Sequence, residues 1–259
     1  MFNAALKYAP GVIRQRLEAE RARVREEDLT SKIRQRSRLV PEASLREVLT
    51  RGVLALADRY GRESLGDYLE FGVYNGTSLT CMYRVMESAK IEHVRLFGFD
   101  SFQGFPASAA VEDEGRWQPG RCYSPLEFTT AVLEAEGIEW SKVALVPGWF
   151  SETLNSDTLT QHQIRKASVI MIDCDLYSSA KAALTFCAPL IQDEALILFD
   201  EWNPRGLEGK TLGEKKAFQE FLTESGCFSA VPFGKYGPRT ETFLVSRVRR
   251  SADQNHGVS

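Results

Sequence analysis

The sequence predicts an α/β fold in which a doubly wound, mostly parallel sheet has helices on both faces. From residue 67 onward, short apolar runs alternate with stretches of helical pattern, the element order that builds parallel sheets. The predicted strands are apolar along their length, as expected for strands that are buried on both faces. Four of them end in acidic residues, at the sheet edge where such folds bind ligands.

Each element follows from the local pattern of side chains. Strands are expected over residues 68–71, 94–99, 143–146, 168–172, 195–199 and 242–245. Helices are expected over residues 77–89, 125–136, 178–190 and 213–225. Residues 168–172 are rich in β-branched side chains and apolar along their length, which favours a strand.

The chain is expected to have three parts. Residues 1–64 form an N-terminal helical extension, rich in helix formers and in charges of both signs. Within it, Leu45, Val48, Leu49 and Val53 share one apolar helix face. Residues 65–248 form the α/β domain, and residues 249–259 a disordered tail. The charges of the extension are expected to face solvent. The alternative is that the extension acts in dimerisation or as a lid. The sequence is therefore compatible with a homo-oligomer.

Composition excludes several classes of protein. The 259 residues are 43% hydrophobic and 26% charged with a net charge of -3, without the basic excess typical of nucleic-acid binders. No apolar run approaches the ~18 residues of a membrane span, and no signal peptide is evident. The five cysteines are scattered without a C-x-x-C pair, which favours a reducing compartment. We expect a cytoplasmic protein with no nucleic-acid or membrane partner.

The first predicted strand ends in a glycine-containing turn. Glu70 ends the strand, Gly72 and Gly76 bracket the turn, and a helix follows. Glycine lets a ligand approach the backbone, the helix N-terminus favours an anionic group, and an acid can hold an ammonium group. The pattern therefore suits an amino-acid moiety better than a dinucleotide, which would require G-x-G-x-x-G. A plain strand-to-helix turn is the alternative.

Asp100 follows the second predicted strand. An acid at this place commonly binds the two hydroxyl groups of a ribose. A turn or helix-cap aspartate is the alternative. An amino acid and a ribose held at adjacent strand ends together describe S-adenosylmethionine.

Five motifs occur in the order found in one known family. The segments 70–78 (EFGVYNGTS), 97–106 (FGFDSFQGFP), 146–150 (VPGWF), 172–179 (IDCDLYSS) and 198–202 (LFDEW) resemble the macrocin O-methyltransferase family. The resemblance covers roughly residues 65–225. It implies a Rossmann-like class I methyltransferase fold, a bound magnesium ion, and methyl transfer to a hydroxyl of a small molecule, often on a sugar of a natural product.

The resemblance also assigns the cofactor residues. The methionine part would be surrounded by Glu70, Gly72, Asn75 and Gly76, and the ribose would be held by Asp100 with Ser101 beside it. The adenine would lie near Gly148, Trp149 and Phe150. An aromatic pair after a strand can cover a planar base, although ordinary core packing is the alternative for these two side chains.

Four acids follow two neighbouring predicted strands: Asp173 and Asp175 after the fourth, Asp200 and Glu201 after the fifth. Magnesium prefers such oxygen ligands, and crowded carboxylates repel one another without a cation. We therefore expect these four to form the metal site, with Asp173 or Asp175 also acting as the general base; helix capping or ion pairing is the alternative. The family motif commonly reads Asp-Asp where this chain has Asp200-Glu201.

The predicted reaction is an in-line displacement in which a metal-bound acceptor hydroxyl attacks the sulfonium methyl group. The loops 107–123 and 202–212 are candidates to gate or select the acceptor. Two other functions compete. Asp173-Cys174-Asp175 after an apolar strand also fits a haloacid-dehalogenase-like phosphatase, with Asp173 as the nucleophile. A non-catalytic cofactor-binding protein could share the fold.

Overall fold

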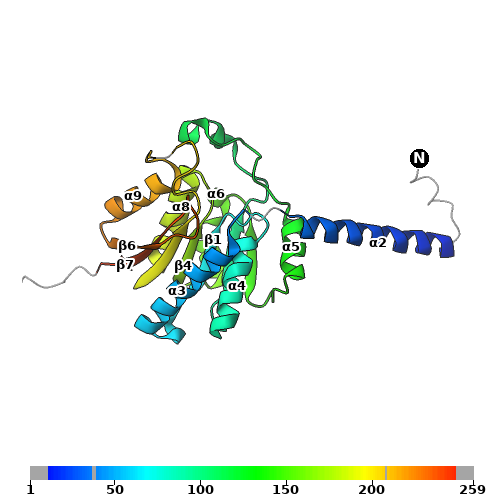
Figure 1. The fold of residues 1–259 in the computed structure, drawn as a ribbon, viewed down its shortest axis with the longest axis horizontal. Coiled ribbons are helices and arrows are strands. Elements are labelled where there is room, and N and C mark those ends of the chain that lie inside the picture. The colour runs from blue at the N-terminus through cyan, green and yellow to red at the C-terminus, as the bar shows by residue number, and fades with distance from the viewer. Residues whose placement is uncertain (1–10, 37–38, 208, 249–259) are drawn as a thin grey trace, which may run out of the picture. The chain divides into compact units, whose positions relative to one another are not determined.

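The computed structural model describes residues 11–36, 39–207 and 209–248 (Figure 1). The chain divides into two compact units, residues 1–37 and 38–259. The predicted tail, residues 249–259, lies outside the described residues. Within the described ranges no helix is long and apolar enough to cross a membrane.

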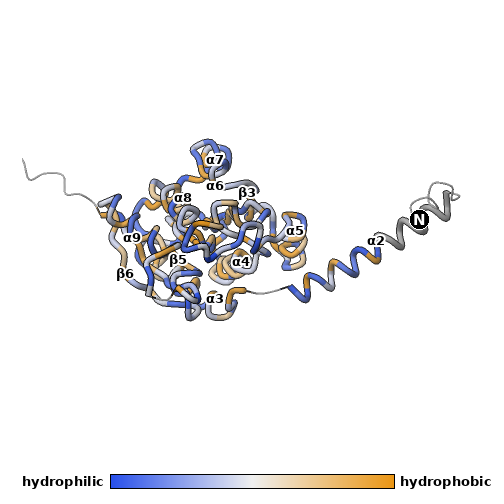
Figure 2. Tube along the Cα trace, turned by 90° about the horizontal axis from the view of Figure 1, so that it is seen from above, coloured by the Kyte–Doolittle hydropathy of each residue, from blue (hydrophilic) through white to orange (hydrophobic). Residues whose placement is uncertain are grey.

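The first unit contains the helix α2 (Gly11–Arg34). Its described side chains, from residue 23 onward, are almost all exposed and mostly hydrophilic (Figure 2). Ion pairs between successive turns, such as Lys32 with Asp28 at 2.7 Å, lie along its surface. The expected solvent-facing character of these charges is therefore confirmed for the described part of α2.

The second unit is built on one seven-stranded sheet. Its strands are β1 (Asp67–Phe71), β2 (Leu96–Asp100), β3 (Val143–Pro147), β4 (Ala167–Ile172), β5 (Glu194–Phe199), β6 (Phe228–Gly234) and β7 (Glu241–Arg247). They lie in the order β3-β2-β1-β4-β5-β7-β6. The first five are parallel, and β7 pairs antiparallel with both β5 and β6. The predicted doubly wound, mostly parallel sheet is confirmed.

Helices cover both faces of this sheet (Figure 1). They are α3 (Glu42–Tyr60), α4 (Thr77–Ala89), α5 (Leu126–Ala135), α6 (Phe150–Thr153), α7 (Ser156–His162), α8 (Tyr177–Cys187) and α9 (Gly213–Ser225). Buried residues of α3, α4 and α5 form one core cluster with the sheet, and buried residues of α8 and α9 form the other. Successive strand residues point to opposite faces, so each strand supplies both clusters.

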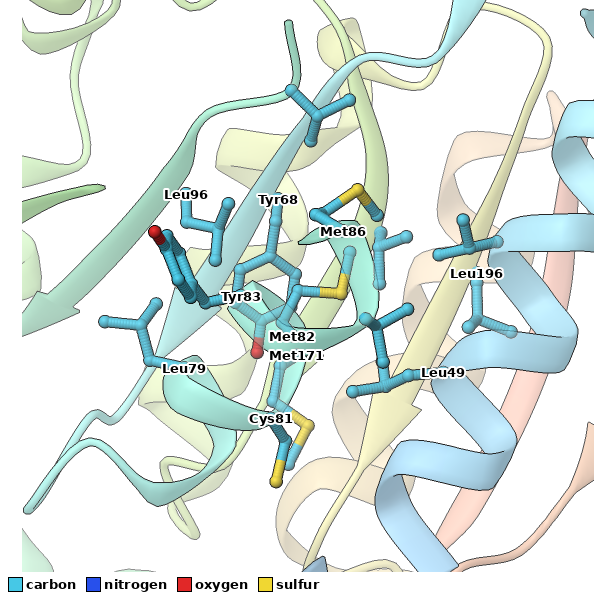
Figure 3. Close-up of a cluster of buried hydrophobic side chains, with 14 of the residues drawn as sticks. Leu49, Tyr68, Leu79, Cys81, Met82, Tyr83, Met86, Leu96, Met171 and Leu196 are labelled. Carbon is cyan, nitrogen blue, oxygen red and sulfur yellow. The ribbon is translucent and has the colours of Figure 1, made fainter. Parts of the chain in front are cut away.

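The core on the α3–α4 face shows how the strands are covered (Figure 3). Tyr68 of β1, Met171 of β4 and Leu196 of β5 meet side chains of α3 and α4. Every residue of β1, β4 and β5 is buried. The continuously apolar strands therefore reflect burial on both faces, as predicted.

Two departures from the sequence-based expectations concern the helix α3 and the strand β6. The helix α3 buries its predicted apolar face against the sheet, so it belongs to the second unit and not to a separate extension ending at residue 64. The strand β6 was not predicted: Pro232 interrupts its pattern, which an edge strand tolerates because one side of its backbone lacks a ladder partner.

The strand order places a topological switch between β1 and β4. The chain runs outward from β1 to β2 and β3, and in the opposite direction from β4 to β5. The chain segments that leave β1 and β4 therefore run in opposite directions, and a crevice remains between them beyond the carboxyl ends of these strands. The registers Phe71–Ile172 and Ile172–Phe199 bring the ends of β1, β4 and β5 level. The residues that follow them are thereby brought to one place.

Candidate active site

A pocket of about 670 Å³ opens beyond the carboxyl ends of β1, β2, β4 and β5. Ten of the predicted site residues line it: Gly72, Asn75, Asp100, Ser101, Trp149, Phe150, Asp173, Asp175, Asp200 and Glu201. Glu70, Gly76 and Gly148 are not part of its wall. The tertiary fold thus gathers side chains from five separate segments around one cavity.

The glycine turn is shaped by close approach of two backbones. Gly72 has φ +92°, and a Cβ there would lie 1.8 Å from the carbonyl oxygen of Asp173. Gly76 has φ +78° and directly precedes α4. Gly72 is required because a side chain would collide with the Asp173 carbonyl. Both glycines are required because residues with a side chain rarely adopt such positive φ values. The turn therefore passes directly beside the loop that carries Asp173.

Asp100 organises this turn from the neighbouring strand. Its Oδ2 accepts hydrogen bonds from the backbone N–H groups of Val73 and Tyr74, at 2.8 and 3.0 Å. Its Oδ1 accepts from the N–H of Phe102 at 2.7 Å. Carboxylate oxygens have further lone pairs, so an Asp100 that lines the pocket can accept from a ligand as well.

Glu70 lies behind the pocket wall. Its side chain is fully buried and accepts hydrogen bonds from the hydroxyls of Tyr68 and Ser78, each at 2.6 Å. Burial raises the pKa of Glu70 from 4.5 to about 8, although both hydroxyls oppose the shift. Ser78 itself lines the pocket. Glu70 therefore does not contact the cavity itself, and it is connected to the pocket wall by its hydrogen bond with Ser78.

The predicted adenine segment lies on the opposite wall. Trp149 and Phe150 line the pocket, and Phe150 also packs edge-on against Phe71 with ring centroids 5.8 Å apart. Gly148 forms the turn after β3, where its N–H donates to the carbonyl of Asp100 at 2.9 Å. Phe150 thus combines core packing with a place on the wall, and Trp149 offers an aromatic surface to it.

Three aspartates crowd the other end of the cavity. The pKa values of Asp173, Asp175 and Asp200 are raised by burial; neighbouring carboxylate charges raise those of Asp173 and Asp175 further. Asp200 accepts a hydrogen bond from the hydroxyl of Tyr236 at 3.0 Å, which opposes its shift. Asp175 adopts the left-handed region with φ +63°. Such a set of oxygen donors suits a hard divalent cation, which would remove the repulsion.

Glu201 has a different partner. One of its oxygens lies 3.2 Å from the guanidinium of Arg239, and the other, Oε2, is buried without a hydrogen-bond partner. Both residues line the pocket. Within the described part of the chain, no three histidine, cysteine, aspartate or glutamate side chains are arranged as metal ligands. The three aspartates thus offer the oxygen donors that a divalent cation prefers but do not stand in a ligand arrangement in this structure, and Glu201 is engaged in an ion pair.

Of the two candidate gating loops, one reaches the pocket. In the segment 107–123, Trp117 and Cys122 line the cavity, whereas Tyr123 is largely exposed. Asp113 anchors this segment by accepting from the N–H groups of Tyr177 and Gly213, at 3.0 and 2.8 Å. None of the described residues in 202–212 lines the cavity.

Several residues at the site had no assigned role in the sequence. Tyr236 and Arg239 come from the β6–β7 hairpin, and no local pattern marks them. Asp113 lies in an irregular loop. Glu214 stands in the first turn of a correctly predicted helix, and its position alone indicated only a helix start.

The chain matches known proteins in sequence and in structure. The model of the family described as macrocin-O-methyltransferase (TylF) matches residues 22–220. A tetracenomycin-type 4'-O-methyltransferase of Streptomyces olivaceus, named for an 8-demethyl-8-(2,3-dimethoxy-alpha-L-rhamnosyl)-tetracenomycin-C, is 32% identical over 143 residues, which is 53% of either chain. The demethyldecarbamoylnovobiocin O-methyltransferase of Streptomyces niveus is 26% identical over 156 residues, 56% of either chain. The chain thus spans about half the length of these relatives.

Two solved structures share the fold. The O-methyltransferase NovP has a TM-score of 0.61 at 19% identity, with 80% of each chain covered. The calicheamicin methyltransferase CalS11 has a TM-score of 0.57 at 22% identity, covering 93% of this chain and 88% of its own. At these identities the likeness supports the Rossmann-like class I arrangement of strands and helices, and nothing about substrates.

Proposed function

Because the chain belongs to the macrocin-O-methyltransferase family, we propose that it is an S-adenosylmethionine-dependent O-methyltransferase. The acceptor is a hydroxyl of a small molecule, on a sugar of a glycosylated natural product. The sugar assignment is supported by the name of the tetracenomycin relative, which describes a rhamnosyl compound and a 4'-O-methylation. Cytoplasmic localisation stays a prediction.

The observation that carries this proposal is the division of one pocket into two unlike halves. Gly72, Asn75, Asp100 and Trp149 form a half suited to an amino acid, a ribose and a base. Asp173, Asp175 and Asp200 form a half suited to a hydroxyl that must lose a proton. A cavity of about 670 Å³ is of the size used to bind small molecules and cofactors.

In the proposed reaction the acceptor oxygen forms a bond to the methyl carbon as the carbon–sulfur bond breaks. The electron pair of that bond returns to sulfur, whose positive charge is neutralised. The hydroxyl proton passes to a carboxylate, Asp173 or Asp175, whose pKa values are raised by burial and by neighbouring carboxylates. The two walls align the reacting atoms, which lowers the entropic part of the barrier.

A magnesium ion is part of the proposal. Asp173, Asp175 and Asp200 would hold it, and it would supply charge that lowers the pKa of the acceptor hydroxyl. The crowding of these carboxylates supports the assignment. Glu201 is a weaker candidate, because Arg239 already pairs with it.

Two measurements test the proposal. Calorimetry with S-adenosylmethionine is expected to give a Kd in the micromolar range, about -8 kcal/mol. A methyl-transfer screen over glycosylated and phenolic acceptors with magnesium is expected to find turnover that excess chelator removes. Asp200→Asn is expected to bind the cofactor with unchanged affinity and to lose turnover.

Three outcomes would count against it. No heat with the cofactor would refute the proposed cofactor, and full turnover in chelator would refute the metal. Cofactor binding without any methyl transfer across the screen would favour the alternative of a non-catalytic binding protein. The phosphatase alternative is disfavoured, because the chain belongs to a methyltransferase family.

A further inference from the structure

Glu214, in the first turn of α9, is fully buried and lies outside the pocket wall. Its Oε1 accepts hydrogen bonds from the backbone N–H groups of Cys174 and Asp175, at 3.2 and 3.1 Å. Its Oε2 accepts from the N–H of Glu201 at 3.1 Å. One carboxylate therefore joins the loop after β4 to the loop after β5.

These contacts differ from those of a helix cap. A glutamate that caps its own helix accepts from N–H groups of that helix, whereas all three donors to Glu214 lie in other loops. The three N–H groups belong to residues beyond the ends of the strands, where no sheet ladder is available to pair them. Glu214 thus supplies partners that the loops lack.

The start of α9 is also fitted closely to the β4 loop. Gly213 has φ +52°, and a Cβ there would lie 3.0 Å from the carbonyl oxygen of Asp175. Asp175 itself has a positive φ of +63°, which a non-glycine residue adopts only when its surroundings hold it. The hydrogen bond from the Asp175 N–H to Glu214 is one such restraint.

We propose that Glu214 is a positioning residue that holds the Asp173–Asp175 loop and the Asp200–Glu201 loop at a fixed separation, so that their carboxylates face the pocket together. The inference rests on the proposed function for its catalytic consequence. Groups that orient metal-binding or catalytic carboxylates without touching the substrate typically change affinity or activity about 10–100-fold when replaced.

The informative variant is Glu214→Gln. The amide keeps the size of the side chain but offers only one oxygen, so its NH₂ group must face at least one of the three N–H donors. Glu224→Gln is the matched control: it makes the same change on the same helix, at a side chain that is 62% exposed and pairs with Lys181. Thermal unfolding establishes that both variants are folded.

The first readout needs no ligand. Hydrogen exchange is measured on the amides of Cys174, Asp175 and Glu201, with the amides of residues 72–76 as an internal reference. Glu214→Gln is expected to speed exchange in at least one of the two loops about tenfold or more and to leave the reference unchanged. Unchanged exchange in both loops, or equal acceleration everywhere, would overturn the positioning role.

The second readout concerns the site. In Glu214→Gln, kcat is expected to fall about 10–100-fold and Mn²⁺ affinity, measured by calorimetry with the metal alone, to fall by a similar factor. The Kd for S-adenosylmethionine is expected to stay within about twofold, because the three hydrogen bonds of Glu214 go to the loops that carry the acids. Wild-type kcat and Mn²⁺ affinity in the variant would overturn the inference. A wild-type chain that neither binds the cofactor nor transfers methyl groups would refute the proposed function, while the exchange data would still decide whether Glu214 holds the loops.

Discussion

Replacement of Gly72 by alanine tests how closely the ends of β1 and β4 approach. The structure places a Cβ at this position 1.8 Å from the carbonyl oxygen of Asp173, against a closest normal approach of 3.0 Å. The carbonyl would have to retreat by about 1.2 Å, which strains the hydrogen bond from the Asp173 N–H to the Phe71 carbonyl at 2.9 Å. The loops that bear the acids would separate from the glycine turn.

The size of the effect follows from three contributions. A positive φ at alanine costs about 1–2 kcal/mol, overpacking about 1–3 kcal/mol, and one weakened backbone hydrogen bond about 1 kcal/mol. We therefore expect Gly72→Ala to lower the free energy of unfolding by about 3–6 kcal/mol, at the upper end of what a single severe core change produces.

Gly61 provides a matched control. Its φ is +88°, close to the +92° of Gly72, but a Cβ at Gly61 would meet nothing within 4 Å. With ψ 143°, Gly61 lies outside the left-handed helical region, so Gly61→Ala should show only the conformational cost of a sparsely populated backbone region, about 1–3 kcal/mol. Urea unfolding followed by circular dichroism measures both variants, and calorimetry shows whether Gly72→Ala still binds S-adenosylmethionine. Equal losses of stability in the two variants would refute the close approach of the strand ends.

Three further predictions concern the cofactor half. The pKa of Glu70 is raised from 4.5 to about 8 in the folded chain, so the folded state retains a proton that the unfolded state loses between these values. The contribution of Glu70 to stability is therefore full below about pH 4.5 and falls as the pH rises to 8, by up to about 5 kcal/mol. The buried aspartates, whose pKa values are also raised, act in the same direction, so Glu70→Gln should reduce this slope in urea unfolding at pH 6 and 9 without abolishing it, and a variant with an unchanged slope would contradict the assignment. Asp100→Asn removes the charged acceptor proposed for the ribose, at about 1.5–3 kcal/mol for a hydrogen bond to a charged group, so the Kd for S-adenosylmethionine should rise about 10–100-fold by calorimetry; an unchanged Kd would count against it. The same change leaves at least one of the three backbone N–H donors facing an amide NH₂, which should lower the stability of the free protein as well. Trp149→Ala should weaken cofactor binding about 2–10-fold if the ring stacks on the base, whereas lower stability with an unchanged Kd would show that the ring serves packing alone.

The sheet was predictable because its signals are local. The apolar runs of β1, β4 and β5 reflect burial on both faces, and the period of α4 and α9 reflects one covered face. The strand β6 was not predicted, because it contains a proline and many exposed residues, which an edge strand tolerates but which hide the usual strand pattern. The short helices α6 and α7 were not predicted, because a helix of one or two turns contains too few residues to show a periodic pattern of apolar side chains.

The site was predictable only in part. That acids after parallel strands meet at one edge follows from topology, and Asp173, Asp175 and Asp200 do line one pocket. The partner of Glu201 could not be predicted, because Arg239 lies 38 residues further along the chain, in a hairpin whose path is set by antiparallel pairing. Two of the donors to Glu214 lie 40 and 39 residues away in sequence, and the third lies 13 residues away across an irregular loop.

The sequence by itself determined the order of the strands β1 to β5 and β7 and of the longer helices, the glycine turn after β1, and the acids at the strand ends, because each depends on residues that are neighbours in the chain. Only the tertiary structure decided which of these acids face the cavity. It buries Glu70 behind the wall, places Asp100 on the wall while its oxygens hold the turn, and makes Glu214 a link between two loops. These outcomes depend on burial and hydrogen bonding between segments far apart in the chain, which no local pattern encodes.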